Sequence, residues 1–179
     1  MIYVFLANGF EECESLVPVD ILRRAGFDLK TVGVGGKTIV GAHDISVVCD
    51  IETKDVVFKN IEAVILPGGM PGTINLENDD VVQKSIDYAN ENNLLIGAIC
   101  AAPSILGHKG ILKGKKATCF DGFEDDLIGT DVINTAVVRD GNIITAKGAG
   151  VAFEFGFELL TYLTNKENTE KLKNTMKFI

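Results

Sequence analysis

The chain has 179 residues, of which 46% are hydrophobic, and a formal net charge of −8 at pH 7. This length and apolar fraction predict one domain, 1–179, with a sizeable core. The acidic balance, without a cluster of lysine and arginine, argues against nucleic acid or an anionic membrane surface as a partner.

The first half of the chain alternates strands with a helix. The apolar run at 2–7 has no basic segment before it and predicts a buried strand rather than a signal peptide. The segment 11–26 predicts a helix, with acidic residues in its first turn and basic residues in its last, and Pro18 should kink it. A strand at 27–34 and a strand pair at 37–50 follow.

The second half repeats this alternation. In order, it predicts a strand at 63–69 that ends in a glycine-rich turn, a helix at 79–93, a strand at 94–99, a helix at 101–108, a short strand at 115–119, a hairpin at 134–146, and helices at 151–163 and 166–177. Buried strands alternating with helices are typical of a mostly parallel sheet with helices on both faces. In such folds the loops at the carboxyl ends of the strands carry the functional residues. In this chain these loops are predicted at 8–14, 67–72 and 99–103.

The cysteine and histidine content bears on metals and on the redox compartment. The four cysteines form no C-x-x-C pair, and the only histidines are His43 and His108, so we expect no metal site and no disulfide scaffold. No apolar run approaches the roughly 18 residues of a membrane span. Reduced thiols in the cytoplasm fit this pattern.

Cys100 lies where the strand at 94–99 meets the next helix, among small neighbours in GAICAAP. A nucleophile at such an elbow is held at the sheet edge, and the helix N-terminus favours its thiolate form. The alternative is that Cys100 is one more small buried hydrophobe. Position alone leaves both interpretations open.

Two further loops could complete a site with this cysteine. The glycines of LPGG let backbone N–H groups face a ligand oxygen, although a lone glycine pair is usually an ordinary turn. In EECE, Glu11 and Glu12 fit a solvated helix cap, whereas Glu14, one turn further on, could face the sheet edge. A protonated Glu14 could then donate a hydrogen bond to a Cys100 thiolate, raising one pKa and lowering the other together.

Four segments together resemble the ThiJ/PfpI superfamily, in the branch of the parkinsonism-associated protein deglycase and its bacterial YajL-like relatives. They are ANGFEECESLVPVDILRRAG, VILPGGMPG, GAICAAPSIL and GAGVAFEFGFELL, which span essentially the whole chain in the family's order. The resemblance implies an α/β fold, a flavodoxin-like three-layer sandwich similar to class I glutamine amidotransferases, and a homodimer.

The resemblance also assigns roles to residues. It implies that Cys100 is the reactive cysteine, that Glu14 is its partner carboxyl, and that Gly69 and Ala101 supply oxyanion-type backbone donors. Ala101 stands where the intracellular-protease branch has histidine, which argues against peptidase activity.

Two aromatic positions concern the same site. Phe120 stands where the deglycase branch often has a histidine, which argues against a catalytic triad. His43 lies near the position from which family members send a basic residue across the dimer interface, and a solvated turn histidine is the alternative.

The resemblance implies a cytoplasmic thiol enzyme of glyoxalase or deglycase type, without metal or cofactor. Its substrate would be a small dicarbonyl such as methylglyoxal or a glycated protein, attacked by Cys100 with Glu14 as acid and base. The alternative from another class is a non-enzymatic redox sensor or chaperone-like stress protein, in which the same cysteine oxidises to a sulfinate.

Overall fold

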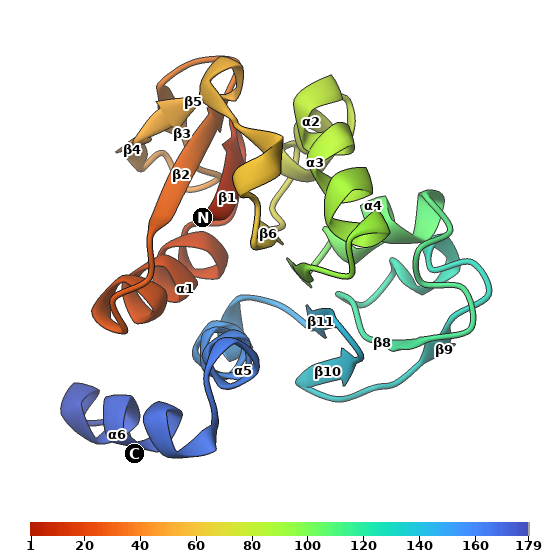
Figure 1. Ribbon diagram of the computed structural model, residues 1–179. Coiled ribbons are helices and arrows are strands. Elements are labelled where there is room, and N and C mark those ends of the chain that lie inside the picture. Colours follow the sequence, from red (N-terminus) through yellow and green to blue (C-terminus); the bar gives the residue numbers. More distant parts are fainter. Residues whose placement is uncertain (179) are drawn as a thin grey trace.

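The computed structural model describes residues 1–178 and has a seven-stranded sheet at its centre (Figure 1). Its strands are β1 (Ile2–Ala7), β2 (Leu29–Val34), β5 (Ile51–Glu52), β6 (Ala63–Leu66), β7 (Leu95–Ile99), β10 (Val137–Asp140) and β11 (Ile143–Ala146). They are ordered β10-β11-β7-β6-β1-β2-β5. All neighbours are parallel except the β10–β11 hairpin, so the carboxyl ends of β1, β6 and β7 lie at one edge.

Helices cover both faces of this sheet. On one face lie α1 (Glu12–Arg24) and α5 (Ala152–Leu163), and on the other lie α2 (Gly72–Glu77), α3 (Asp80–Glu91) and α4 (Pro103–His108) (Figure 1). This arrangement confirms the predicted flavodoxin-like three-layer α/β sandwich with a mostly parallel sheet. No helix among residues 1–178 is long and apolar enough to cross a membrane.

The central strands are apolar throughout because both of their faces are covered. In β1, alternate side chains enter different cores: Ile2, Val4 and Leu6 pack with residues of α1 and α5, whereas Tyr3, Phe5 and Ala7 pack with residues of α2, α3 and α4. Each fully buried large apolar side chain contributes about 1.5–3 kcal/mol relative to its exposure to water. The two cores therefore fix the register of the strands and the direction of the loops that follow them.

Close packing between α1 and α5 sets the position of the first helix. A Cβ on Gly156 of α5 would stand 2.6 Å from Cδ1 of Ile21 and 3.3 Å from Cα of Pro18. Pro18 lies inside α1, which continues beyond it to Arg24, so the proline does not end the helix. The glycine thus lets the two helices approach closely and holds α1 against the sheet.

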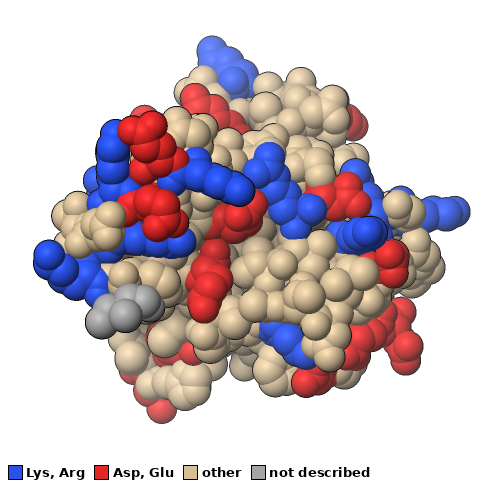
Figure 2. All heavy atoms as spheres, turned by 90° about the horizontal axis from the view of Figure 1, so that it is seen from below, with Lys and Arg blue, Asp and Glu red and all other residues tan. Residues whose placement is uncertain are grey.

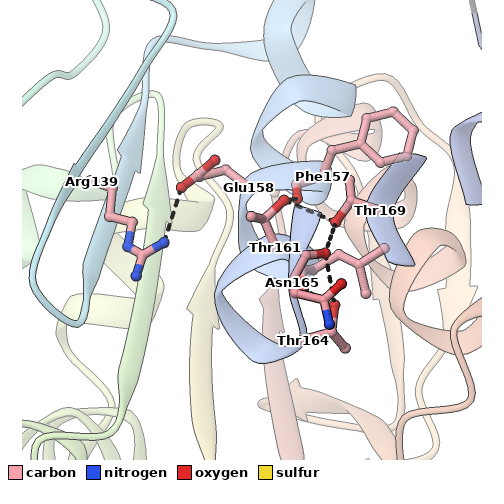
Figure 3. A network of polar contacts seen from close by, with 8 residues as sticks. Arg139, Phe157, Glu158, Thr161, Thr164, Asn165 and Thr169 are labelled. Carbon is pink, nitrogen blue, oxygen red and sulfur yellow. Dashed lines mark hydrogen bonds and ion pairs between the residues drawn. The ribbon is translucent and has the colours of Figure 1, made fainter. Parts of the chain in front are cut away.

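The last helix, α6 (Lys166–Met176), is attached to α5 by a small polar network (Figure 3). The Asn165 side chain caps α6 by accepting from the N–H of Asn168 at 2.9 Å, and the hydroxyls of Thr161 and Thr169 are 2.9 Å apart. Around this end of the chain, positive and negative side chains are interspersed and form no patch of one sign (Figure 2). Nothing on this face therefore favours a strongly charged partner.

Some elements differ from the sequence predictions. The strand pair at 37–50 is present as β3 (Thr38–Val40) and β4 (Ser46–Val48), but it forms its own two-stranded sheet. The short strand near residue 116 is β8 (Lys116–Ala117), which pairs with the unpredicted β9 (Asp131–Val132). Residues 1–178 also form four 3₁₀ helices: η1 (Thr53–Asp55), η2 (Phe58–Asn60), η3 (Glu124–Asp126) and η4 (Ala149–Val151).

Candidate active site

The loops that follow β1, β6 and β7 meet at the carboxyl edge of the sheet. The N–H of Glu11 donates to the carbonyl of Gly68 at 3.0 Å, which joins the first loop to the second. A Cβ on Gly68 would stand 2.7 Å from both Cβ of Cys100 and Oε2 of Glu14. The structure therefore brings Cys100, Glu14 and the glycine pair together, because Gly68 has no side chain to separate them.

Cys100 is held in a left-handed backbone conformation, with φ of 65°. It follows β7 directly and precedes α4, which begins at Pro103. Its N–H donates to the carbonyl of Ala146 at 2.9 Å, and its own carbonyl accepts from the N–H of Phe120 at 2.8 Å. A non-glycine residue at positive φ is strained, and here hydrogen bonds on both sides hold it at the strand–helix elbow.

Glu14 is a buried carboxyl in the first turn of α1, only 1% exposed. Its Oε2 accepts from the N–H of Gly68 at 2.9 Å, and its other contacts include the N–H of Ala149 and the thiol of Cys100. Burial raises the pKa of this carboxyl to about 7, although the hydrogen bonds oppose the rise. The predicted rise in the pKa of Glu14 is therefore confirmed.

The prediction for the thiol was wrong in direction. Burial, the charge of Glu14 and its hydrogen bond raise the pKa of Cys100 to about 12, while the N–H groups of Ala101 and Gly69 lower it. We expected the helix N-terminus to lower this pKa. However, α4 has six residues and begins three residues after the cysteine, so its field at the sulfur is weak compared with burial beside a carboxylate.

Two of the causes that raise the thiol pKa exist only while Glu14 is ionised. When the carboxyl is protonated, it no longer repels a thiolate and can donate a hydrogen bond to it. Cys100 and Glu14 are thus a coupled pair that loses its first proton at about pH 7 and then shares the remaining proton between the sulfur and the carboxyl. The Ala101 and Gly69 donors favour the form in which the sulfur carries the charge.

Gly69 has a specific backbone requirement at this site. Its φ is +88°, and a Cβ there would stand 2.4 Å from the backbone nitrogen of Glu11. Only glycine tolerates both conditions, so this position presents an N–H toward the Cys100 sulfur without any side chain nearby. The glycine pair in LPGG is therefore more than an ordinary turn.

The remaining acidic residues of the first loop have different environments. Glu11 caps α1, since its Oε2 accepts from the N–H of Glu14 at 2.7 Å. The expectation of a solvated Glu12 was wrong, because this residue is 6% exposed and accepts from both the backbone N–H and the ring of His43, at 2.8 and 2.7 Å. Although burial opposes it, these His43 hydrogen bonds lower the pKa of Glu12.

His43 lies in the β3–β4 turn with an exposed ring and is bonded to Glu12 of its own chain. Together with Glu11 these two residues place possible metal ligands within 4.8 Å of one another. The hydrogen bonds already described occupy an oxygen of Glu11 and both oxygens of Glu12. The cluster is therefore explained as a helix cap with an ion pair.

His108 is also engaged away from the thiol. Its Nδ1 lies 2.6 Å from Oε1 of Glu77, and its Nε2 lies 3.3 Å from Oδ1 of Asp126. These bonds raise the pKa of His108, the largest cause being Glu77. Each histidine of the chain is thus paired with carboxylates, and the partner of Cys100 is Glu14.

Sequence reasoning connected Phe120 with the site but missed the segment 147–151. Together they line a depression of about 320 Å³ next to Glu14. Gly148 allows this contact, because a Cβ there would stand 3.3 Å from the Phe120 ring and 3.9 Å from Oε1 of Glu14. The glycines that flank Ala149 in KGAGV were the available signal.

Comparison with known sequences finds a family and several relatives that match most of the chain. The model of the DJ-1/PfpI family matches residues 1–162. "Protein dj-1beta" of Drosophila melanogaster is 33% identical over 172 residues, which cover 94% of this chain and 92% of the relative. The "Glutathione-independent glyoxalase DJR-1.2" of Caenorhabditis elegans is 33% identical over 164 residues, with coverage of 90% and 87%.

A third relative and a solved structure extend the comparison. "Deglycase PH1704" of Pyrococcus horikoshii is 32% identical over 144 residues, which cover 79% of this chain and 86% of the relative. The crystal structure of Drosophila melanogaster DJ-1beta superposes with a TM-score of 0.94 at 30% identity and covers 99% of this chain and 97% of its own. This chain belongs to the DJ-1/PfpI family.

Proposed function

We propose that the chain is a cofactor-independent glyoxalase or deglycase that acts on methylglyoxal-like dicarbonyls or on their early protein adducts. The observation that carries the proposal is the coupled Cys100–Glu14 pair, which places a nucleophile and an acid/base group at one buried site beside two backbone donors. The names of the glyoxalase and deglycase relatives support the same class of substrate. No metal or redox partner is required by this chemistry.

In the first step, the sulfur of Cys100 adds to the aldehyde carbon. The S–C bond forms, the C=O π bond breaks, and the resulting oxyanion accepts hydrogen bonds from the N–H groups of Gly69 and Ala101. Glu14, which holds the shared proton when the sulfur is ionised, delivers that proton to the oxygen and gives a hemithioacetal. This step leaves Glu14 as a carboxylate next to the former aldehyde carbon.

In the second step, the Glu14 carboxylate removes the proton from that carbon. The electron pair forms a C=C bond while the adjacent carbonyl oxygen takes the negative charge, which gives an enediolate. Glu14 then returns the proton to the adjacent carbon, and the hydroxyl proton of the first carbon passes to the adjacent oxygen, which leaves a thioester on Cys100. Water then cleaves the thioester, so that methylglyoxal and water give lactate and the free thiol. A carboxyl whose pKa lies near neutral pH suits both proton removal and proton delivery.

The test is conversion of methylglyoxal to lactate without glutathione. We expect wild-type turnover to be lost in Cys100→Ser, because the hydroxyl is a far weaker nucleophile. Glu14→Gln should also lose turnover, since it keeps the shape but cannot transfer a proton. Cys13→Ser, which changes an exposed thiol on α1, is the matched control and should keep turnover.

A redox sensor remains the competing function, and a structural feature favours it. The same N–H donors and the protonated Glu14 would hold the oxygens of a Cys100 sulfinate. Absence of methylglyoxal turnover in the wild type, with peroxide oxidation confined to Cys100 and retained in Glu14→Gln, would favour that function over the enzyme.

A homodimer in the cytoplasm forms part of the proposal. The β3–β4 hairpin exposes Val40, Ile45 and Val48 to 38%, 53% and 69%, which is a suitable apolar surface for a second copy. Sedimentation at micromolar concentration should give a dimer for the wild type and for Val57→Asp, a control at a 41% exposed position outside the hairpin, and a monomer for Val48→Asp. The four free thiols support a reducing compartment.

A further inference from the structure

The depression next to Glu14 is built mainly from apolar groups. It has a volume of about 320 Å³ and is lined by Phe120, Asp121, Lys147, Gly148, Ala149, Gly150 and Val151. Phe120 is 48% exposed, so about half of its side-chain surface faces the depression and solvent rather than the core. Core packing therefore accounts for only part of the surface of this ring.

Backbone contacts fix this ring relative to the reactive groups. The N–H of Phe120 donates to the carbonyl of Cys100 at 2.8 Å, so the residue is tied to the elbow itself. A Cβ on Gly148 would be in contact with both the Phe120 ring and Oε1 of Glu14. Gly148 therefore lies between the Phe120 ring and Glu14, and through it the depression is one residue away from the Cys100–Glu14 pair.

The charges in the lining are already paired. The Lys147 ammonium lies 2.9 Å from Oδ1 of Asp121 and also donates to the side chain of Asn134. What the lining offers to a ligand is therefore the Phe120 face, the Val151 side chain and the small residues between them. Such a surface favours an uncharged apolar group, with an aromatic ring gaining most from stacking or edge contact.

We propose that this depression binds the substituent on the carbonyl group of the substrate, and that Phe120 makes the site prefer dicarbonyls with an aryl substituent over methylglyoxal. The inference deepens the proposed function and rests on it for turnover. Gly148 puts no side chain between the Phe120 ring and the Glu14 carboxyl, so a substituent in the depression would lie on the Glu14 side of the pair. Phe120 is thus a specificity residue that takes no part in proton transfer.

Turnover of phenylglyoxal and methylglyoxal provides the first measurement. We expect wild-type kcat/KM to be higher for phenylglyoxal, and the ratio of the two values to fall about tenfold in Phe120→Ala, the scale on which a hydrophobic pocket discriminates. Phe120→Leu, which keeps an apolar side chain, should give an intermediate ratio. Ile128→Ala, at a 65% exposed position outside the lining, is the matched control and should leave the ratio unchanged.

A second measurement does not depend on turnover. The Cys100 sulfur displaces iodide from N-phenyl iodoacetamide or from iodoacetamide, forming an S–C bond as the C–I bond breaks. The wild type and Ile128→Ala should react faster with the aryl reagent, and Phe120→Ala should lose that preference. If no dicarbonyl turns over but this pattern is found, the proposed function fails and the aryl subsite stands. Equal reagent ratios in the wild type and Phe120→Ala would overturn the subsite.

Discussion

Burial of Glu14 should make the stability of the fold depend on pH. The pKa of this carboxyl is about 7 in the folded chain, against an ordinary value of 4.5. Between these values the folded state keeps a proton that the unfolded chain releases, so the free energy of unfolding falls as the pH rises. The difference in pKa corresponds to about 3 kcal/mol. This is a large part of the stability of a typical domain.

Glu14→Gln removes this dependence, because an amide does not titrate. We expect the free energy of unfolding of the wild type, measured by urea denaturation under reducing conditions, to fall relative to that of the variant by about 3 kcal/mol between about pH 4.5 and about pH 8. Glu91→Gln, at an exposed position at the end of α3, should track the wild type over the same range.

A constant stability difference between the wild type and Glu14→Gln over this range would refute the reasoning. It would mean that the carboxyl ionises as easily in the folded chain as in water, and hence that water reaches it. The shared proton of the Cys100–Glu14 pair would then have no physical basis.

Three further changes test the packing at the site, the stability of the fold and the role of His43. Gly68→Ala should destabilise the fold by about 1–3 kcal/mol in urea denaturation and slow Cys100 alkylation, because its Cβ would overlap that of Cys100. A Cβ on Gly150 meets nothing within 4 Å, so Gly150→Ala should keep the stability of the wild type. Asp79→Ala removes the N-cap of α3 and should cost about 1 kcal/mol in the same assay. His43→Gln should leave the alkylation rate of Cys100 unchanged, and a slower rate would show that this histidine reaches a thiol site.

Much of the fold could be predicted because its strands are buried on both faces. The unbroken apolar run of β1 and the alternation of such runs with amphipathic helices leave few arrangements other than a parallel sheet between helical layers. The strands and helices that the sequence did not predict are short. The two residues of β5 pair only with Val32 and Gly33, and α2 has six residues, so neither is long enough to show a periodic pattern.

The location of the candidate site could be predicted from the sequence, but its electrostatics could not. Parallel strands bring the loops after β1, β6 and β7 together, and this topology alone places Glu14 near Cys100. The thiol pKa depends on burial and on the Glu14 charge, and the burial of Glu12 depends on a hydrogen bond from His43. Such long-range contacts have no signature in the local sequence.

The shared proton predicts an unusual pH profile for the reactivity of Cys100. The reactive form, a thiolate beside a protonated Glu14, carries the same number of protons as a thiol beside an ionised Glu14. The ratio between these two forms is therefore independent of pH, and both appear together as the pair loses its first proton.

The alkylation rate of Cys100 should accordingly rise through about pH 7 and then reach a plateau, although the thiol pKa is raised to about 12 while Glu14 is ionised. In Glu14→Gln the two causes that come from the carboxylate disappear, and the rate should instead follow the ionisation of the thiol alone, with no inflection near pH 7. If the alkylation rate of the wild type instead increases tenfold per pH unit from pH 7 to pH 9, the two groups ionise independently. In that case the activation of the thiol would have to come from the Gly69 and Ala101 donors alone.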